Sequence, residues 1–189
     1  FEKVVFDNAR LNEHHSVVDY LAQLPPWDQE TRLDIWLITY AGVADTEFNR
    51  VASALPLIAA VRRVKNHAHS AGTKFDELLV LIGPQGQGKS KLFANLCPKA
   101  HWFTDGMALG DDPKTTIENA TGIWISEIAE LRGRGSELDN IKSYLSRSVD
   151  GPARLAYART PVRKARQFIN FGTTNDRRFL SDPTGNRRF

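Results

Sequence analysis

One stretch of this 189-residue chain, residues 83–90, combines glycines, a lysine and a serine at a spacing suited to binding phosphate. It reads Gly83-Pro84-Gln85-Gly86-Gln87-Gly88-Lys89-Ser90 and fits the pattern G-x-x-x-x-G-K-[ST]. The glycines let the backbone wrap around a phosphate with its N–H groups inward, and the following helix adds its positive amino-terminal end. We expect Lys89 to reach the β- and γ-phosphates and the Ser90 hydroxyl to bind Mg²⁺. The stretch therefore predicts a nucleotide site.

A carboxylate suited to metal binding or water activation follows a second apolar segment. Glu127 closes the strand candidate at residues 123–125 and lies 44 positions beyond Gly83. An acidic residue at the carboxyl end of a buried strand points into the crevice where ligands bind in open α/β sheets. Glu130, three residues later, can share that crevice. Alternatively, one of the two glutamates caps a turn or pairs at the surface, so Glu127 is our first choice and Glu130 our second.

A side chain that can hold an attacking water without repelling it follows another strand candidate. Asn175 ends the run Phe171-Gly172-Thr173-Thr174-Asn175. Its uncharged amide can hydrogen-bond the water or the γ-phosphate of a bound nucleotide. The alternative is an asparagine that opens a turn with Asp176, a common use of this residue type.

Basic side chains crowd the segment just before the last strand candidate. They are Arg147, Arg154, Arg159, Arg163, Lys164 and Arg166, with Tyr157 among them. Cations can grip the phosphates of single-stranded DNA, and an aromatic ring can stack on a base. The alternative is a surface loop whose arginines meet acidic residues of a neighbouring subunit.

The charge of the chain is unevenly distributed. Residues 1–130 carry 12 Lys and Arg against 17 Asp and Glu, a net charge of −5. Residues 131–189 carry 13 against 5, a net charge of +8, and the whole chain has a charge of +3 and a pI of about 9.1. A basic carboxyl-terminal third on an acidic body indicates a polyanion-binding face, and a solvated surface is the alternative.

Strand and helix candidates alternate through the second part of the chain and are expected to position these residues. The strand candidates are residues 78–82, 101–103, 123–125 and 167–172, and the helix candidates are residues 90–96 and 137–146. The continuous apolar run at 78–82 is typical of a strand buried on both faces of a parallel sheet. Residues 150–166 are expected to form a loop or a β-hairpin. The alternation predicts an α/β fold.

The first 73 residues are predicted to form a helical subdomain ahead of a core at residues 74–189. Helices are expected at residues 17–24, 31–40 and 47–64, before a polar linker at residues 65–73. Side chains available for the buried face of the third helix are Leu55, Ile58, Ala59, Val61 and Val64. The cations Arg62, Arg63 and Lys65 near its end suit the helix dipole.

The composition excludes several classes of protein. Hydrophobic residues make up 41% and charged residues 25%, and no apolar run approaches the roughly 18–20 residues that cross a bilayer. A single cysteine, Cys97, excludes an internal disulfide and a structural zinc site and fits a cytoplasmic location. The chain begins at Phe1 and stops at Phe189 after a charged motif, so we interpret it as a fragment of a larger protein with a core incomplete at its carboxyl end.

The strand predicted at residues 101–103 falls between the strand of the 83–90 loop and that of Glu127. This arrangement favours the ATPase branch with an inserted strand, which includes the recombinase-like and AAA+ proteins, over nucleotide kinases.

With these elements in place, the chain resembles the virulence-associated protein E family of phage, plasmid and genomic-island proteins, a P-loop group similar to superfamily-three helicases. The matching strings are Trp27-Asp28, Arg32-Leu33, Lys74-Phe75-Asp76, Gly83-Pro84-Gln85-Gly86, Trp124-Ile125, Glu127-Ile128-Ala129-Glu130-Leu131, Gly172-Thr173-Thr174-Asn175 and residues 182–189. They span nearly the whole chain in order.

The resemblance implies an AAA+-like, superfamily-three-helicase-like P-loop NTPase core that uses ATP with Mg²⁺. It also implies a homo-oligomeric ring, typically a hexamer, a role in replicating mobile DNA, and other modules such as a primase domain. By that pattern Glu127 matches the Walker B acid and Asn175 the sensor residue. Arg188 matches the arginine finger delivered across a subunit boundary, with Arg187 as second choice.

The chain departs from many helicases at one position. Ser126 precedes Glu127 where those proteins have two adjacent acids, so either one carboxylate does both jobs or Glu130 supplies the second. The division of labour between the carboxylates stays open at this point.

The leading hypothesis is an ATP-hydrolysing DNA helicase or translocase of a phage, prophage or mobile element, acting as a ring on single-stranded DNA. A second is a replication-associated ATPase that loads or remodels partner proteins without unwinding DNA. The third is a non-hydrolysing ATP-binding regulatory module. The intact set of Lys89, Ser90, Glu127 and Asn175 argues against the third.

Overall fold

The computed structural model describes residues 14–107, 112–131, 136–156, 159–180 and 186–189. The chain forms two compact units, residues 1–30 and 31–189. The first contains helix α2 (Ser16–Ala22), whose amino end is capped by the His15 side chain accepting from the Val18 N–H at 3.3 Å. The second contains the sheet and all other described helices, so this division does not coincide with the subdomain boundary expected after residue 73.

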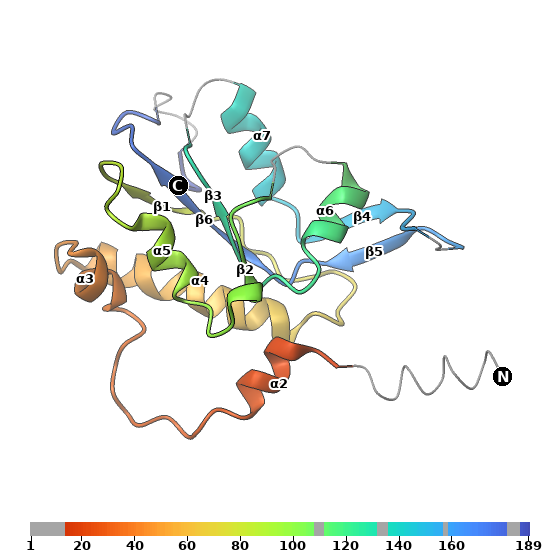
Figure 1. The fold of residues 1–189 in the computed structure, drawn as a ribbon, viewed down its shortest axis with the longest axis horizontal. Coiled ribbons are helices and arrows are strands. Elements are labelled where there is room, and N and C mark those ends of the chain that lie inside the picture. Colours follow the sequence, from red (N-terminus) through yellow and green to blue (C-terminus); the bar gives the residue numbers. More distant parts are fainter. Residues whose placement is uncertain (1–13, 108–111, 132–135, 157–158, 181–185) are drawn as a thin grey trace. The chain divides into compact units, whose positions relative to one another are not determined.

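A parallel four-stranded sheet forms the centre of the second unit (Figure 1). Its strands are β1 (Leu79–Ile82), β6 (Ile169–Thr174), β3 (Ile125–Ile128) and β2 (Phe103–Thr104), in that order across the sheet. Every neighbouring pair is parallel. The expected mixed α/β fold with a parallel sheet is therefore confirmed.

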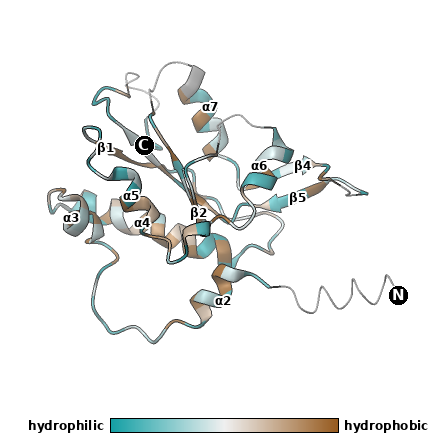
Figure 2. Cartoon of the chain, viewed as in Figure 1, coloured by the Kyte–Doolittle hydropathy of each residue, from teal (hydrophilic) through white to brown (hydrophobic). Residues whose placement is uncertain are grey.

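The central strands are β6 and β3, and both are buried at every position. Strand β1 is apolar throughout, as its brown colour shows (Figure 2), yet it lies at an edge and Ile82 is 46% exposed. The expectation that residues 78–82 are buried on both faces is therefore wrong. An apolar run does not distinguish an edge strand from a central one, and the central strands of this sheet carry polar residues, among them Glu127 and Thr173.

The strand that separates β1 from β3 in the sheet is β6, which comes last in the sequence. The strand predicted at residues 101–103 is a 3₁₀ turn at Ala100–Trp102 followed by the two-residue strand β2. β2 lies at the opposite edge of the sheet from β1. The strand that intervenes between β1 and β3 is therefore β6 and not β2.

Helices cover both faces of the sheet, as Figure 1 shows. The helices of this unit are α3 (Trp36–Ala41), α4 (Glu47–Lys65), α5 (Lys89–Ala94), α6 (Pro113–Asn119) and α7 (Ser136–Leu145). On one face Phe93 of α5 stacks on Phe171 of β6 with ring centroids 4.3 Å apart. Ile128 is in register with Gly172, the residue after Phe171, so its side chain lies on the other face, where α7 packs.

Most predicted elements are present with shifted ends. The second, fourth and fifth predicted helices are α3, α5 and α7, and the last predicted strand is β6. Helix α6 was not predicted, although Asp112 accepts from the N–H groups of Lys114 and Thr115 and Pro113 occupies the first turn, both ordinary start signals. Residues 150–166 contain a hairpin of β4 (Val149–Ala153) and β5 (Val162–Ala165), as one of the two expectations had it.

Helix α4 buries a different set of residues from the set expected. Its bounds match the prediction within one residue, and Ala59 and Val64 are buried as expected. Leu55 and Ile58 are exposed, so their assignment to the buried face is wrong. Their expected place is taken by Ser53 and Arg63, both of which are buried.

Arg63 fastens the end of α4 to the sheet. Its guanidinium donates to the carbonyl oxygens of Thr73 (3.2 Å), Phe75 (2.8 Å) and Phe168. Burial, and secondarily the charge of Arg166, lowers the pKa of Arg63 to about 10. The expectation that Arg63 merely suits the helix dipole missed this role, because three carbonyls from distant segments meet the side chain.

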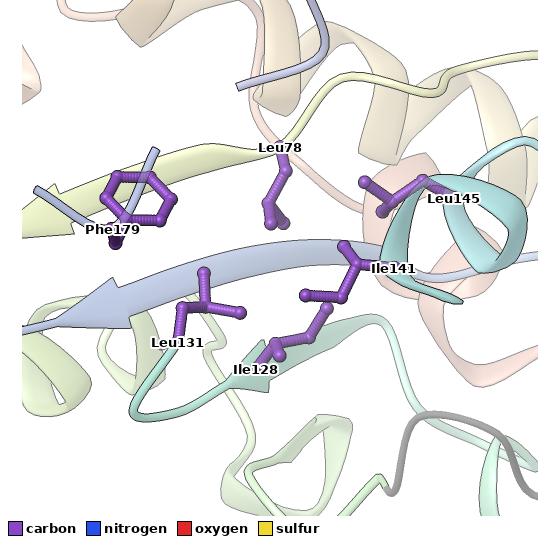
Figure 3. Close-up of a cluster of buried hydrophobic side chains, with 6 residues drawn as sticks. All are labelled: Leu78, Ile128, Leu131, Ile141, Leu145 and Phe179. Atoms are coloured by element: carbon purple, nitrogen blue, oxygen red, sulfur yellow. The ribbon is translucent and has the colours of Figure 1, made fainter. Parts of the chain in front are cut away.

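A compact apolar cluster joins α7 to the sheet (Figure 3). Ile141 and Leu145 of α7 point toward Leu78, Ile128 and Leu131, and Phe179 completes the cluster. Gly172 lies beneath it, where a Cβ atom would stand 2.7 Å from Leu131 Cδ1 and 3.0 Å from Val80 Cγ2. The cluster therefore packs directly on the backbone of β6.

We expect Gly172→Ala to lower the free energy of unfolding by about 1–3 kcal/mol, because the added methyl group overpacks this contact. Gly106→Ala is the matched control, since a Cβ there meets only Thr104 Oγ1, at 3.6 Å. Chemical denaturation of both variants measures the difference. Equal stability of the two variants would contradict close packing of the cluster on Gly172.

Candidate phosphate-binding cleft and basic hairpin

The 83–90 loop connects β1 to α5 and borders an open cleft of about 290 Å³. Gly86 and Gly88 have φ angles of 82° and 79°, in the left-handed region that residues with a Cβ rarely adopt. The motif thus places glycine where the backbone requires it. The cleft is lined by residues 85–91, Ala129, Glu130, Thr173 and Asn175. It therefore lies at the carboxyl ends of the strands, where ligands bind in open α/β sheets.

The ammonium group of Lys89 turns back over the loop. It donates to the carbonyl oxygens of Gly83 at 2.7 Å and Pro84 at 2.8 Å, and to Asn175 Oδ1 at 2.9 Å. The last contact brings the predicted Asn175 to the predicted Lys89 across 86 positions of sequence. Both residues line the cleft.

Glu127 lies inside strand β3, two residues beyond the start of the strand, and is fully buried. Two hydroxyl groups donate to its Oε1 atom: Ser90 Oγ at 2.8 Å and Thr173 Oγ1 at 2.6 Å. Among the described residues, no donor reaches the other carboxylate oxygen, Oε2, which is also buried. The structure thus brings the two predicted metal ligands, Ser90 and Glu127, into contact and leaves one carboxylate oxygen for another partner.

Thr173 is a candidate functional residue that the sequence motifs did not single out. It lies two positions after Phe171, on the same face of β6, and Glu127 is in register with Phe171 on the neighbouring strand. The strand alternation of Phe171, Thr173 and Asn175 was the signal that could have identified it.

Glu130 and Ser126 differ in their relation to the cleft. Glu130 lines it and is exposed, and its backbone has a left-handed φ of 54°. Ser126 is buried and is adjacent to Glu127 in the strand, so its side chain lies on the opposite face of the sheet. A second carboxylate in the cleft can therefore come from Glu130, whereas position 126 faces away from the cleft.

Arg188 lies away from the cleft of its own chain. Its carbonyl oxygen accepts from the Leu78 N–H at 2.6 Å, and its Nε donates to Asp76 Oδ2 at 3.0 Å. These contacts hold it at the amino-terminal end of β1, roughly 16 Å along the strand from Gly83. Burial alone would raise the pKa of Asp76, but the hydrogen bond from Arg188 and the charge of Lys74 lower it.

Arg187 is exposed and borders the same charged hollow as Arg188. The other residues that line this hollow are Lys74, Asp76 and Glu77. Neither arginine therefore serves the cleft in cis, and a finger role for either requires a second subunit.

The β4–β5 hairpin carries exposed cations at one side of the sheet (Figure 1). The exposed basic residues of the predicted DNA-binding set are Arg154, Arg159, Arg163 and Lys164, and Arg147 before β4 is exposed as well. Arg154 Nη2 donates to the Arg159 carbonyl at 3.4 Å across the hairpin. Tyr157 lies outside the described residues.

Arg166 does not belong with these cations, and its assignment to the DNA-binding set is wrong. Its buried guanidinium donates from Nε and Nη2 to the Asp150 carboxylate at 2.8–3.0 Å, and from Nη1 to the Tyr144 carbonyl at 2.6 Å. It also lies 4.2 Å from the centre of the Tyr144 ring, and burial raises the pKa of Tyr144 to about 12. Arg166 therefore anchors the hairpin to α7 and has no surface to offer DNA.

A family model described as the virulence-associated protein E-like domain matches residues 21–189. The chain belongs to this family. The match includes the cleft, the hairpin and Arg188, so every candidate residue of the site lies within the virulence-associated protein E-like domain. A search of curated proteins finds no match to the chain.

Two features are absent from the described part of this virulence-associated protein E-like domain. Within the described ranges, no three His, Cys, Asp or Glu side chains gather into a metal site made by the protein alone. No helix in that part of the chain is long and apolar enough to cross a membrane.

Proposed function

We propose that the cleft binds ATP with Mg²⁺ and that the chain hydrolyses this nucleotide. The observation that carries the proposal is the contact of Ser90 with Glu127, which joins the end of the 83–90 loop to the buried carboxylate of a central strand. Lys89 and Asn175 meet beside it. A lysine, a hydroxyl, a carboxylate and an amide at one cleft are the groups that phosphoryl transfer requires.

The residues present fit a magnesium ion. Mg²⁺ prefers oxygen ligands and is held by one or two protein groups together with phosphates and water. Ser90 Oγ and the Glu127 carboxylate supply such oxygens, and the buried Oε2 atom lacks a donor among the described residues. When bound, the ion would neutralise charge on the phosphates.

The side chains have separable tasks in this proposal. Lys89 exchanges the carbonyl oxygens of Gly83 and Pro84 for phosphate oxygens and so stabilises negative charge. Asn175 holds Lys89 and the attacking water. Thr173 and Ser90 fix the Glu127 carboxylate through Oε1, and Oε2 is left for the ion.

Membership of the virulence-associated protein E-like family supports a biological setting for the proposal. We propose that the chain acts in a ring of identical subunits, that Arg188 reaches the cleft of the neighbouring subunit, and that the cations of the hairpin contact single-stranded DNA. The activity is then that of a translocase or helicase for replication of a phage, plasmid or other mobile element.

ATP turnover with and without single-stranded DNA tests this function. We expect turnover in the wild-type chain, stimulation by DNA, and loss of both in Lys89→Ala. Turnover that DNA does not change would favour an ATPase that remodels proteins. ATP binding without turnover would favour a regulatory module.

Thr173→Val is expected to lower ATP turnover by about 10- to 150-fold, because a hydrogen bond to a charged group contributes about 1.5–3 kcal/mol. ATP affinity should change little, since Thr173 contacts Glu127 and not the loop. Thr121→Val is the matched control, because Thr121 Oγ1 donates to the Ile117 carbonyl at 2.8 Å and Thr121 does not line the cleft. An equal loss of turnover in both variants would remove Thr173 from the proposed site.

Arg159→Ala and Arg163→Ala are expected to weaken binding of single-stranded DNA and to reduce the salt slope by about one unit each, because each variant loses a phosphate contact. Fluorescence anisotropy over a salt series measures both quantities. Lys99→Ala removes an exposed cation outside the hairpin and serves as the control. An unchanged slope in the hairpin variants would assign these arginines to a subunit interface instead.

A further inference from the structure

The solvent-facing side of α4 is apolar along most of its length. Phe48 is 76% exposed, Val51 49%, Leu55 47% and Ile58 43%. The opposite side of the same helix is buried, with Ala59, Ala60 and Val64 in the interior. A helix that is apolar on both sides is normally covered on both, and exposed apolar patches of this kind mark interaction surfaces.

These four residues, which we call the α4 stripe, have the spacing of a helix-pairing seam. They recur at intervals of three, four and three positions, which is the a and d pattern of a coiled coil. Phe48 and Leu55 occupy a positions and Val51 and Ile58 occupy d positions. The stripe is therefore suited to another helix, more than to a flat or irregular surface.

The two ends of the stripe carry opposite charges. Glu47 lies at its amino-terminal end, where Asp34 and Asp45 are already paired with Arg50. Arg62 and Lys65 lie at its carboxyl-terminal end, and Glu47, Arg62 and Lys65 are all exposed. A second α4 in parallel orientation would place like charges together, whereas an antiparallel α4 places each acidic end beside a basic one. An antiparallel pairing also sets each a position against a d position, so Phe48 meets Ile58 and Val51 meets Leu55.

We propose that the α4 stripe binds the α4 stripe of a second copy of this chain in antiparallel orientation, forming a two-fold dimer. The inference uses neither the cleft nor nucleotide, so it goes beyond the proposed function and is independent of it. We choose a second copy of the chain as the partner because of charge complementarity. The acidic end of one α4 lies beside the basic end of a second α4 only when the second helix runs in the opposite direction. The surface is self-complementary, as an isologous interface must be.

Sedimentation equilibrium of the whole chain tests the dimer. In buffer without nucleotide or DNA, where the proposed ring is not expected to assemble, we expect the mean mass to rise from monomer to dimer between roughly 5 and 500 µM, as a small apolar interface allows. Leu55→Glu should remain monomeric over that range. Leu24→Glu is the matched control, because Leu24 is the same residue type, is also 47% exposed and lies outside α4. A wild-type chain that stays monomeric, or a Leu55→Glu chain that dimerises normally, would overturn the proposal.

Charge exchange provides a second, milder test. Arg62→Glu should weaken the dimer at least tenfold, and adding Glu47→Arg to it should restore the dimer. Failure of the second change to restore it would remove the charge argument. Lys89→Ala should dimerise as the wild-type chain does, so loss of the proposed nucleotide site and loss of the dimer are distinguishable.

Disulfide cross-linking tests the orientation in a Cys97→Ala background. In an antiparallel pair, two copies of residue 48 lie about 15 Å apart along the axis, because ten residues of helix separate positions 48 and 58. We therefore expect an oxidised cross-link when Phe48→Cys and Ile58→Cys chains are mixed, and little in either chain alone. Cross-linking of Phe48→Cys chains to one another, without a cross-link between Phe48→Cys and Ile58→Cys chains in the mixture, would show a parallel pair. That result would overturn the antiparallel assignment.

Discussion

Lys89→Ala should abolish ATP turnover by the chain, with a fall of at least about 10³-fold, because the charge that develops on the transferring phosphoryl group then has no fixed cation beside it. The structure gives a reason to expect a clean effect. Lys89 contacts carbonyl oxygens and Asn175 and no carboxylate in the described contacts, so its removal breaks no ion pair there. Steady-state phosphate release measures the loss.

A matched control for Lys89→Ala is available on the same unit. Lys99 is exposed and lies 5.0 Å from the Trp102 ring centre, away from the residues that line the cleft. Lys99→Ala should keep wild-type turnover. Turnover that survives in Lys89→Ala, or that falls equally in both variants, would contradict a phosphate role for Lys89.

Arg188→Ala should reduce turnover by about 10³-fold or more while ATP binding persists, which is the behaviour of an arginine finger. The structure holds Arg188 at the end of β1 far from its own 83–90 loop, so any catalytic action must occur on another subunit. Mixing provides the decisive experiment. A Lys89→Ala chain retains Arg188, and an Arg188→Ala chain retains Lys89, so a mixture of the two inactive variants should recover turnover.

If Arg188 has only a structural role, the expected effects on stability and turnover are different. Asp76 is the hydrogen-bond partner of Arg188, so Asp76→Asn would then lower stability and turnover as much as Arg188→Ala does. If Arg188 is a finger, we expect Asp76→Asn to leave turnover within a few fold of wild type. No recovery in the mixture, together with equal losses in the two single variants, would assign Arg188 to folding. Arg187→Ala tests the second choice in the same way.

The residues of the cleft could be predicted from the sequence because each of them belongs to a local sequence pattern. The 83–90 motif, Glu127 and Asn175 each follow an apolar segment, and parallel strands bring their carboxyl ends to one edge of a sheet. The structure places Lys89 against Asn175 and Ser90 against Glu127, as expected from that geometry. Thr173 was not predicted, because threonine is common in strands. Only the register of β6 with β3 places its hydroxyl group beside Glu127.

The sequence was insufficient where burial depends on distant partners. Arg166 looked like a surface cation among other arginines, but the pairing of Val149 with Ala165 brings Asp150 to its guanidinium. Arg63 resembled a helix-end cation and instead meets three carbonyls. In the same way, Leu55 and Ile58 are apolar enough for a core, yet which side of α4 faces the sheet is decided by tertiary packing.

Titration calorimetry with ATP and Mg²⁺ tests the proposed phosphate site most directly, because it requires neither DNA nor a ring. We predict one ATP site per chain that depends on Mg²⁺, is lost in Lys89→Ala and is retained in Arg188→Ala. A wild-type chain that binds no ATP, or a Lys89→Ala chain that binds it with wild-type affinity, would contradict the proposal that residues 83–90 hold its phosphates.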